Sequence, residues 1–225
     1  MSDSKKSLLP LRVSPQPVLK IPKSERTRAA ILNAALDFLW SQAFRDMTVN
    51  AVMASAGASR AVFYQYFGDL HTLMDTLLDM VQEEIFDACS PWVTGVGDPV
   101  ALMGEALAGL VQVGYERGPF LRAITDAAST DPRLEKAWLQ FLVGFDNAAT
   151  ARIEADQRQV LIPDFEVRPV AFALNRLNAY TLLQAFGQRP RQQPDPVREA
   201  LTRIWISTLY GAEWLEKKSS DLVRK

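Results

Sequence analysis

The sequence predicts an all-α protein of about nine helices. From Ser24 onward, apolar residues recur three and four positions apart, which is the spacing of one face of a helix. No segment shows the strict alternation of apolar and polar residues that is typical of a half-buried strand. Clusters of proline and glycine separate the apolar runs at intervals of helical length.

The composition is that of a soluble globular protein, since 48% of the 225 residues are hydrophobic and 23% are charged. This length allows one large domain or two small ones. A single cysteine, Cys89, excludes an intramolecular disulfide and a cysteine-rich zinc site. A single histidine, His71, leaves little room for a catalytic triad or a histidine metal cluster. We therefore expect a cytoplasmic protein that is not an enzyme and that uses no metal or cofactor.

The formal net charge of -1 is divided unevenly along the chain. Residues 1–70 carry nine basic and five acidic side chains, a net charge of +4, so the remainder carries -5. This division favours a front that contacts a polyanion and a body with another role. A solvated basic tail is the alternative interpretation of the same charges.

The first 23 residues are predicted to form a flexible basic arm, because their prolines prevent a continuous helix. Pro10 interrupts the only apolar pair near the start, Leu8-Leu9, which argues against a signal peptide. The weakly charged stretch between Arg168 and Arg189 contains asparagine and glutamine and is too polar to span a bilayer. We therefore expect no membrane partner.

The front of the chain is predicted to contain three helices. The first has Ser24 as its N-cap and an apolar face that begins at Ile31. Two short helices follow, at residues 48–56 and 59–67, on either side of a turn at Gly57.

Six further helices are predicted in the body. Asp69 caps a long helix that ends near the Pro91 to Pro99 cluster. Two of the others are expected at residues 103–111 and 167–186. A short helix is expected after Gly118-Pro119, a long helix is expected to begin at Pro132, and a last helix is expected after residues 190–196.

The segment from Thr48 to Phe67 has helix-turn-helix form. Gly57 gives the turn its backbone freedom, and Ser59 can cap the second helix. The first residues of such a helix reach base edges in a major groove, so we expect Arg60 to read guanine and Gln65 to read adenine. The hydroxyls suited to phosphate contact are those of Thr48, Ser59, Tyr64 and Tyr66. An ordinary helical hairpin with surface tyrosines is the alternative.

The run from Arg26 to Leu73 resembles the N-terminal domain of the TetR family of bacterial transcriptional regulators. The resemblance is carried by Thr48-Val49, by Ala56 to Ser59 and by the aromatic residues from Phe63 to Phe67. It implies a dimeric regulator of double-stranded operator DNA, located in the bacterial cytoplasm with the nucleoid. It also implies that Thr48, Ser59, Tyr64 and Tyr66 contact the DNA backbone.

Two departures from the family pattern affect the expected DNA contacts. A lysine that usually follows the closing aromatic residues is replaced by Leu70, and the usual Gly-Thr pair is Ala61-Val62. Ala61 is therefore expected to contact a thymine methyl group. Basic residues of the arm and first helix, including Arg28, are expected to restore phosphate affinity.

The body resembles the EthR-like branch of the family. The matching residues are Trp138 and Phe141, then Leu174-Asn175 and Asn178, and finally Ile204 to Gly211. The resemblance implies an apolar tunnel for a lipophilic effector, in which Asn175 and Asn178 are polar anchors. The implied walls are Met103, Leu107, Leu110, Trp138, Phe141, Leu142, Phe145, Phe186 and Trp205.

The residues alone leave alternatives open for the body. An aromatic stripe such as Trp138, Phe141 and Phe145 is also typical of an ordinary core. The two asparagines need partners, which could be each other, a carbonyl, water, a second subunit or a ligand.

The last two helices are expected to form the dimer surface, because residues 167–186 are apolar almost all round. The side chains expected to join them are Val197, Leu201, Ile204, Trp205 and Leu209.

We therefore expect three parts: an arm at 1–23, a helix-turn-helix domain at 24–68 and a ligand-binding and dimerisation domain at 69–225. The expected function is a repressor that a lipophilic small molecule releases from its operator. The alternative is a helical small-molecule or lipid carrier with a basic tail that binds no specific DNA.

Overall fold

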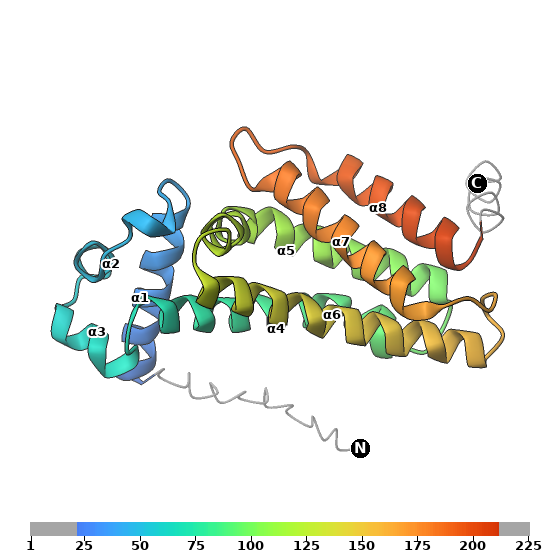
Figure 1. Ribbon diagram of the computed structural model, residues 1–225, viewed down its shortest axis with the longest axis horizontal. Helices are drawn as coiled ribbons and strands as arrows, with labels where there is room; N and C mark the ends of the chain where they lie inside the picture. Colours follow the sequence, from blue (N-terminus) through green and yellow to red (C-terminus); the bar gives the residue numbers. More distant parts are fainter. Residues whose placement is uncertain (1–21, 212–225) are drawn as a thin grey trace, which may run out of the picture.

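A computed structural model describes residues 22–211, and within this range the chain is all-helical, as predicted. Most of the expected arm, residues 1–21, lies outside the described residues. A head contains α1 (Lys23–Leu39), the 3₁₀-helix η1 (Phe44–Asp46), α2 (Val49–Ser55) and α3 (Arg60–Tyr66). The body contains α4 (Leu70–Thr94), α5 (Pro99–Ala128), α6 (Pro132–Arg158), α7 (Val167–Phe186) and α8 (Pro194–Leu209). Figure 1 shows the head at one end of the elongated body, with α4 running from one into the other.

The head is held together by a small apolar core. Ile31 and Ala35 of α1 are fully buried, and so are Val52 of α2 and Phe63 of α3. The helix α1 begins at Lys23, with Pro22 at its N-cap position, rather than behind a Ser24 cap. A proline there loses nothing, because the first N–H groups of a helix have no intrahelical partner.

Three aspartates begin the helices of the body. The side chains of Asp69, Asp98 and Asp131 each accept a hydrogen bond from a backbone N–H in the first turn of α4, α5 and α6 respectively. These bonds satisfy N–H groups that a helix cannot pair by itself. These three helices therefore have a defined start, and Asp69 has the capping role expected of it.

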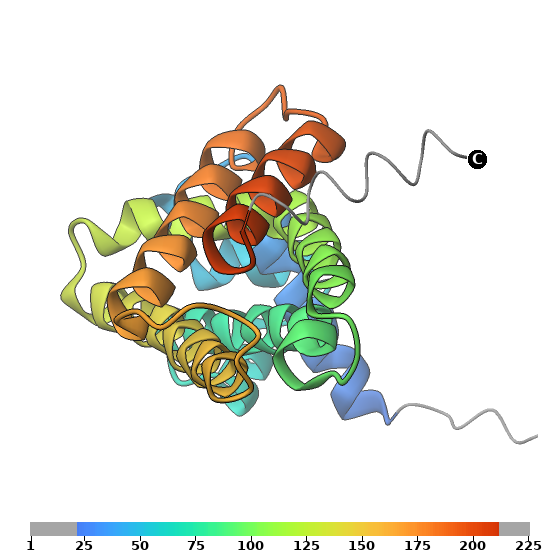
Figure 2. The ribbon, with the colours of Figure 1, turned by 90° about the vertical axis from the view of Figure 1, so that its right-hand side faces the viewer.

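The helix α5 lies in the middle of the body and contacts α4, α6, α7 and α8. The end-on view in Figure 2 shows the helices of the body gathered around a common interior. Thirteen residues of α5 are buried, including Gly114 and Gly118. An apolar helix with small residues is what such a central position requires.

The predicted break at Gly118-Pro119 does not occur, so the described residues contain eight α-helices instead of nine. Pro119 has no N–H, and the carbonyl of Tyr115 loses its helical donor. The Nη1 group of Arg191 replaces that donor at 2.6 Å. In α4, Pro91 similarly frees the carbonyl of Asp87, which accepts a hydrogen bond from the Ser90 hydroxyl at 2.7 Å. The helices continue because side chains satisfy the carbonyls that the prolines leave free.

The helix α8 differs from the expectation at the dimer surface. Val197, Leu201, Trp205 and Leu209 are buried inside their own subunit, on the side that faces the bundle. Ile204 alone of the five expected residues is exposed. One face of an amphipathic helix can be satisfied within the monomer, and the sequence pattern does not say which apolar neighbour covers it.

No helix between residues 22 and 211 is long and apolar enough to cross a membrane.

Gly118 marks the closest approach of α5 to α7, which makes it a test of the packing. A Cβ atom there would lie 2.6 Å from the carbonyl oxygen of Phe186. We expect Gly118→Ala to lower the free energy of unfolding by about 1–3 kcal/mol, because the overpacked helices must separate. Urea unfolding followed by circular dichroism measures this change.

Gly104 provides the matched control on the same helix, since a Cβ there meets nothing within 4 Å. Gly104→Ala should leave stability unchanged or raise it by up to about 1 kcal/mol. Equal effects of the two substitutions would contradict the close approach of α5 and α7.

Candidate nucleic-acid interface and effector cavity

The segment predicted as a helix-turn-helix has that geometry. Thr48 caps α2, since its hydroxyl accepts a hydrogen bond from the N–H of Ala51 at 3.1 Å. Gly57 has a φ of +66°, in the left-handed region that favours glycine. Ser59 occupies the N-cap position of α3, but its side chain makes no capping bond. Its hydroxyl is therefore available for another partner.

The helix α3 separates its buried and exposed residues. Phe63 is fully buried against the head, and Phe67, just after the helix, is 2% exposed. The side chains on the opposite side are solvent-exposed: Arg60, Ala61, Tyr64 and Gln65. Thr48 and Ser59 are exposed as well, whereas Tyr66 is half-buried. The predicted DNA contacts thus lie on an accessible surface, with Tyr66 at its edge.

Two arginines of the head stack on its aromatic residues. The Arg60 guanidinium lies 5.7 Å from the centre of the Tyr64 ring, and its Nη2 group donates to the Tyr64 hydroxyl at 3.1 Å. The Arg28 guanidinium lies 5.8 Å from the centre of the Phe67 ring, which places Arg28 next to the end of α3. Both contacts restrict long side chains that would otherwise lose more entropy on binding.

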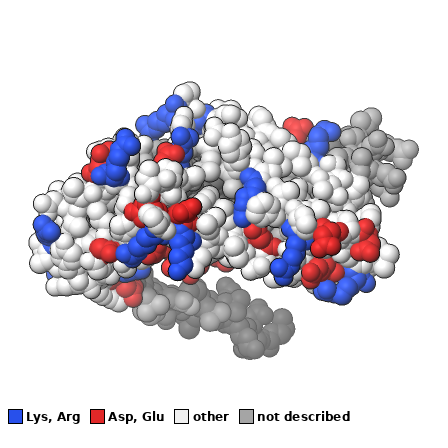
Figure 3. Space-filling model, in the orientation of Figure 1, with Lys and Arg blue, Asp and Glu red and all other residues white. Residues whose placement is uncertain are grey.

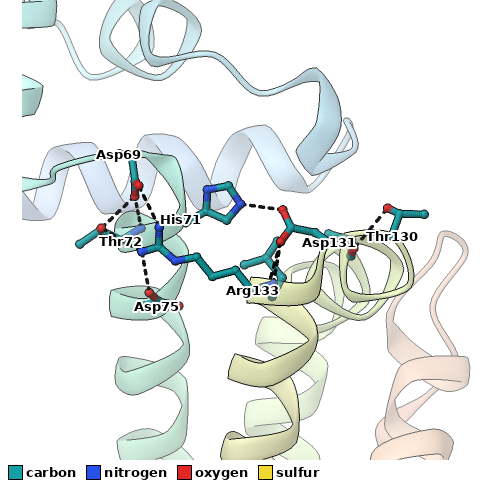
Figure 4. A network of polar contacts seen from close by, with 9 residues as sticks. Asp69, His71, Thr72, Asp75, Thr130, Asp131 and Arg133 are labelled. Atoms are coloured by element: carbon teal, nitrogen blue, oxygen red, sulfur yellow. Dashed lines mark hydrogen bonds and ion pairs between the residues drawn. The ribbon is translucent and has the colours of Figure 1, made fainter.

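Two N-capping aspartates are joined crosswise where the head meets the body (Figure 4). Asp69 caps α4 and accepts a hydrogen bond from Arg133, the second residue of α6, at 2.9 Å. Asp131 caps α6, and its Oδ2 lies 2.6 Å from Nε2 of His71, the second residue of α4. A side chain of α6 thus contacts the capping aspartate of α4, and a side chain of α4 contacts the capping aspartate of α6. The only histidine of the chain has a structural partner here.

An apolar cavity of about 100 Å³ lies among the five helices of the body. A single water needs about 10–15 Å³ on the same measure, so the cavity has room for several heavy atoms. Ten of the eleven residues implied as effector contacts line it: Met103, Leu107, Leu110, Trp138, Phe141, Leu142, Phe145, Asn175, Asn178 and Trp205. The exception is Phe186, which is fully buried against Tyr115 near the end of α7.

In each of the two asparagines of the cavity, one group of the side-chain amide forms a hydrogen bond with another side chain. The carbonyl of Asn178 accepts a hydrogen bond from Nε1 of Trp205 at 2.9 Å. The NH₂ group of Asn175 donates to Asp146 at 3.0 Å, and Arg176 pairs with the same carboxylate at 2.9 Å. Among the described residues, the NH₂ group of Asn178 and the carbonyl of Asn175 have no hydrogen-bond partner. Both asparagines line the cavity, each with part of its amide free of hydrogen bonds to the described residues.

The far end of the body contains a buried polar network that the sequence pattern did not reveal. Nε1 of Trp92 donates to the Tyr210 hydroxyl at 2.8 Å, and this hydroxyl donates to Asp156 at 2.7 Å. Asp156 is 1% exposed and lies 2.9 Å from Nε of Arg152. Burial raises the pKa of Tyr210 above its ordinary range. The network fixes the indole of Trp92, which is one wall of the cavity.

Much of the wall that α4 contributes was also missed from the sequence. Ile85, Phe86, Cys89 and Trp92 all line the cavity. Their spacing continues the apolar stripe of the helix through Pro91, where the prediction ended it. Burial raises the pKa of the Cys89 thiol to about 12, so this wall is uncharged.

Between residues 22 and 211, no group of three or more His, Cys, Asp or Glu side chains is placed to hold a metal ion.

The crossed caps generate a prediction about acid stability. The N–H of Thr72, followed by the Thr72 hydroxyl and Arg133, lowers the pKa of Asp69 to about 2. A lowered pKa contributes stability above the unfolded value near 3.8, and this contribution is lost as the pH falls through the folded value. Asp69→Asn keeps a capping oxygen but removes the charge. We expect its stability deficit to be largest above pH 4 and to disappear towards pH 2, measured by thermal unfolding across pH.

Asp79→Asn, at an exposed position of the same helix, is the control for the loss of one charge. If the deficit of Asp69→Asn does not vary with pH, the negative charge of Asp69 does not stabilise the folded state.

Comparisons with known proteins agree with both parts of the structure. Residues 31–74 match the family described as bacterial regulatory proteins, tetR family, and residues 103–211 match the C-terminal domain of the transcriptional regulator EthR.

Two curated relatives extend over most of the chain. The HTH-type transcriptional regulator EthR of Mycolicibacterium smegmatis is 25% identical over 193 residues, covering 84% of this chain and 89% of the relative. EthR of Mycobacterium tuberculosis is 26% identical over 205 residues, covering 84% and 90%.

The crystal structure of a putative TetR-family transcriptional regulator from Syntrophomonas wolfei has the same fold, with a TM-score of 0.73 at 15% identity over 83% of this chain and 96% of that one. These matches cover the helix-turn-helix and the cavity-bearing body together. The chain belongs to the TetR family of bacterial transcriptional regulators and has an EthR-like C-terminal domain.

Proposed function

We propose that this protein is a homodimeric repressor that a lipophilic small molecule releases from operator DNA in the bacterial cytoplasm. The observation that carries the proposal is the position of α4. Three residues separate this helix from the end of α3, and its other end lines the apolar cavity. One rigid element thus joins the candidate reading surface to the candidate effector site. The proposed parts are the arm at 1–23, the helix-turn-helix domain at 24–68 and the effector domain at 69–225.

The proposed DNA contacts follow from exposure and chemistry. The guanidinium of Arg60, at the start of α3, can donate two parallel hydrogen bonds to guanine, and Gln65 can pair with adenine. The methyl group of Ala61 suits a thymine methyl. The proposed phosphate contacts are Thr48, Ser59, Tyr64, Tyr66 and Arg28.

The proposed dimer surface lies on the outer side of α7 and α8. Phe172 and Tyr180 of α7 are 52% and 67% exposed, and Ile204 of α8 is 37% exposed. Figure 3 shows that charges of both signs are mixed on the visible face and leave broad uncharged areas between them. Large apolar side chains exposed along two adjacent helices favour burial against a second copy.

The proposed effector is a lipophilic molecule with one hydrogen-bonding group. Its apolar part would occupy the space between Trp138, Phe141 and Leu107. A carbonyl of the effector could accept from the NH₂ group of Asn178, and a donor could pair with the carbonyl of Asn175. Binding that favours a different splay of α4 would misplace the two heads for successive grooves and lower DNA affinity.

A helical carrier with a basic tail is the competing function, and a gel-shift experiment separates the two. The DNA upstream of the protein's own gene is titrated with protein at several salt concentrations, with and without lipophiles extracted from the host cells. Specific complexes that weaken steeply as the salt concentration rises, and that dissociate when the extract is added, support the repressor function. Binding of the lipophiles without specific DNA complexes would establish the carrier.

Substitution of Arg60 tests the reading surface. We expect Arg60→Ala to weaken operator binding by about 1–3 kcal/mol and to relax selectivity at one base pair, because a bidentate contact to guanine is lost. Affinity is measured by fluorescence anisotropy on the operator and on a duplex altered at each guanine in turn. Arg45→Ala is the control, since Arg45 is exposed in the head but outside α3. Unchanged selectivity in Arg60→Ala would remove Arg60 from the readout.

Substitution of Asn178 tests the effector site. Asn178→Leu alone would leave the buried indole N–H of Trp205 without its acceptor, at a cost of about 1–3 kcal/mol. The double variant Asn178→Leu/Trp205→Phe removes both partners, and Trp205→Phe alone is the control that keeps the amide. We expect the double variant to bind DNA normally but to lose release by the lipophile extract, while the control retains it. If the double variant is released from DNA at the same extract concentration as the wild type, Asn178 does not anchor the effector.

A further inference from the structure

Two arginines of the connection between α7 and α8 reach the head at a point away from α4, where α1 and η1 also pack against α5. Arg191 lies in the connection between α7 and α8, which approaches the head in Figure 1. Its guanidinium lies 4.9 Å from the centre of the Trp40 ring, just after α1, and 3.8 Å from the centre of the Tyr115 ring in α5. The cation is therefore held between an aromatic ring of the head and one of the body.

The backbone of α5 makes this position specific for a hydrogen-bond donor. Pro119 removes the donor that would occupy the Tyr115 carbonyl, and Nη1 of Arg191 fills the vacancy at 2.6 Å. Because the carbonyl is part-buried, losing this donor carries a desolvation cost. The planar guanidinium can stack on a ring and donate in its own plane at once, which a lysine cannot do.

The neighbouring contacts extend this clamp to α7. The Tyr115 ring packs edge-on against Phe186, with ring centres 5.4 Å apart. The N–H of Gln192 donates to the carbonyl of Ala185 at 2.9 Å, which ties the connection to the end of α7. Gly118 lets α5 approach Phe186 at van der Waals distance. Arg191 therefore sits on a packed group that includes α5 and the end of α7.

We propose that Arg191 is a positioning residue for DNA reading, because it clamps the head against the helices that form the proposed dimer surface. The distance and angle between the two reading heads then depend on the Arg191 clamp at α5 and α7, together with the crossed caps at α4 and α6 and the packing of α1 and η1 against α5. This inference rests on the proposed function, since head spacing matters only in a DNA-binding dimer.

Operator spacing provides the functional test. A duplex is selected from random-sequence DNA with the wild-type protein, and versions with one or two base pairs inserted between the half-sites are made. We expect Arg191→Gln to bind the selected duplex about tenfold more weakly than the wild type does. On the duplexes with altered spacing, we expect the affinity of the variant to differ much less from that of the wild type. A substitution that merely destabilised the protein would weaken all duplexes equally. Wild-type discrimination between spacings in Arg191→Gln would overturn the proposal.

Arg189→Gln is the matched control. The Arg189 guanidinium also lies over the Trp40 ring, at 5.1 Å, but it makes neither the Tyr115 stack nor the carbonyl bond. We expect it to keep the wild-type preference for spacing. If Arg191→Gln does not fold, Arg191→Lys keeps the charge without the planar stack and should reduce the preference partly. A full preference in Arg191→Lys would then count against the clamp.

Spin labels test the clamp without DNA. Labels at exposed positions of the head and of α6, Ser55→Cys and Glu154→Cys, are introduced in a Cys89→Ala background. The labelled chain is mixed with excess unlabelled protein, so that the distance reports one subunit. Double electron–electron resonance should give a narrow distribution of distances between the two labels for the wild type and a broader one for Arg191→Gln. Equal widths would refute the clamp, whereas failure of the wild type to bind any duplex would refute only the proposed function.

Discussion

The body depends on the burial of α5 among four other helices. Neighbouring helices approach α5 closely, which explains the glycines at 114 and 118. It also carries Pro119, whose missing N–H leaves a polar vacancy at the part-buried carbonyl of Tyr115. The residue that fills this vacancy comes from the connection between α7 and α8, so the central helix also determines where that connection lies.

The cavity follows from the same arrangement. Aromatic and aliphatic side chains of all five body helices, including Trp205 of α8, line the space that these helices leave between them. The two asparagines of the cavity wall each form one side-chain hydrogen bond within the protein: Asn178 with Trp205 and Asn175 with Asp146. These bonds restrict the rotation of both amides, and a group held in one orientation loses less entropy when it binds a partner.

The sequence predicted much of this fold because periodicity and capping are local properties. Gly57 and Asp69 have the roles in the turn and at the helix cap that their positions indicated. The errors arose where long-range contacts replaced a local signal. Pro119 did not end a helix, because an arginine 72 positions later supplied the missing donor. The capping expected of Ser24 and Ser59 did not form.

The effector walls were less predictable than the helices. Resemblance led to the residues on α5, α6 and α7, but the stretch of α4 beyond Ile85 was cut short at Pro91, and Phe186 belongs to the packing around Tyr115. The network of Trp92, Tyr210 and Asp156 joins residues more than 50 positions apart, and no periodicity signals such a contact.

The environment of Cys89 has a consequence for the signals to which the protein can respond. With a thiol pKa of about 12, only roughly one molecule in 10⁵ carries the thiolate at neutral pH. Peroxides and disulfides react with the thiolate and not with the thiol. The Cys89 side chain therefore behaves as a small hydrophobic group in the wall of the cavity and is poorly suited to act as a sensor of oxidants.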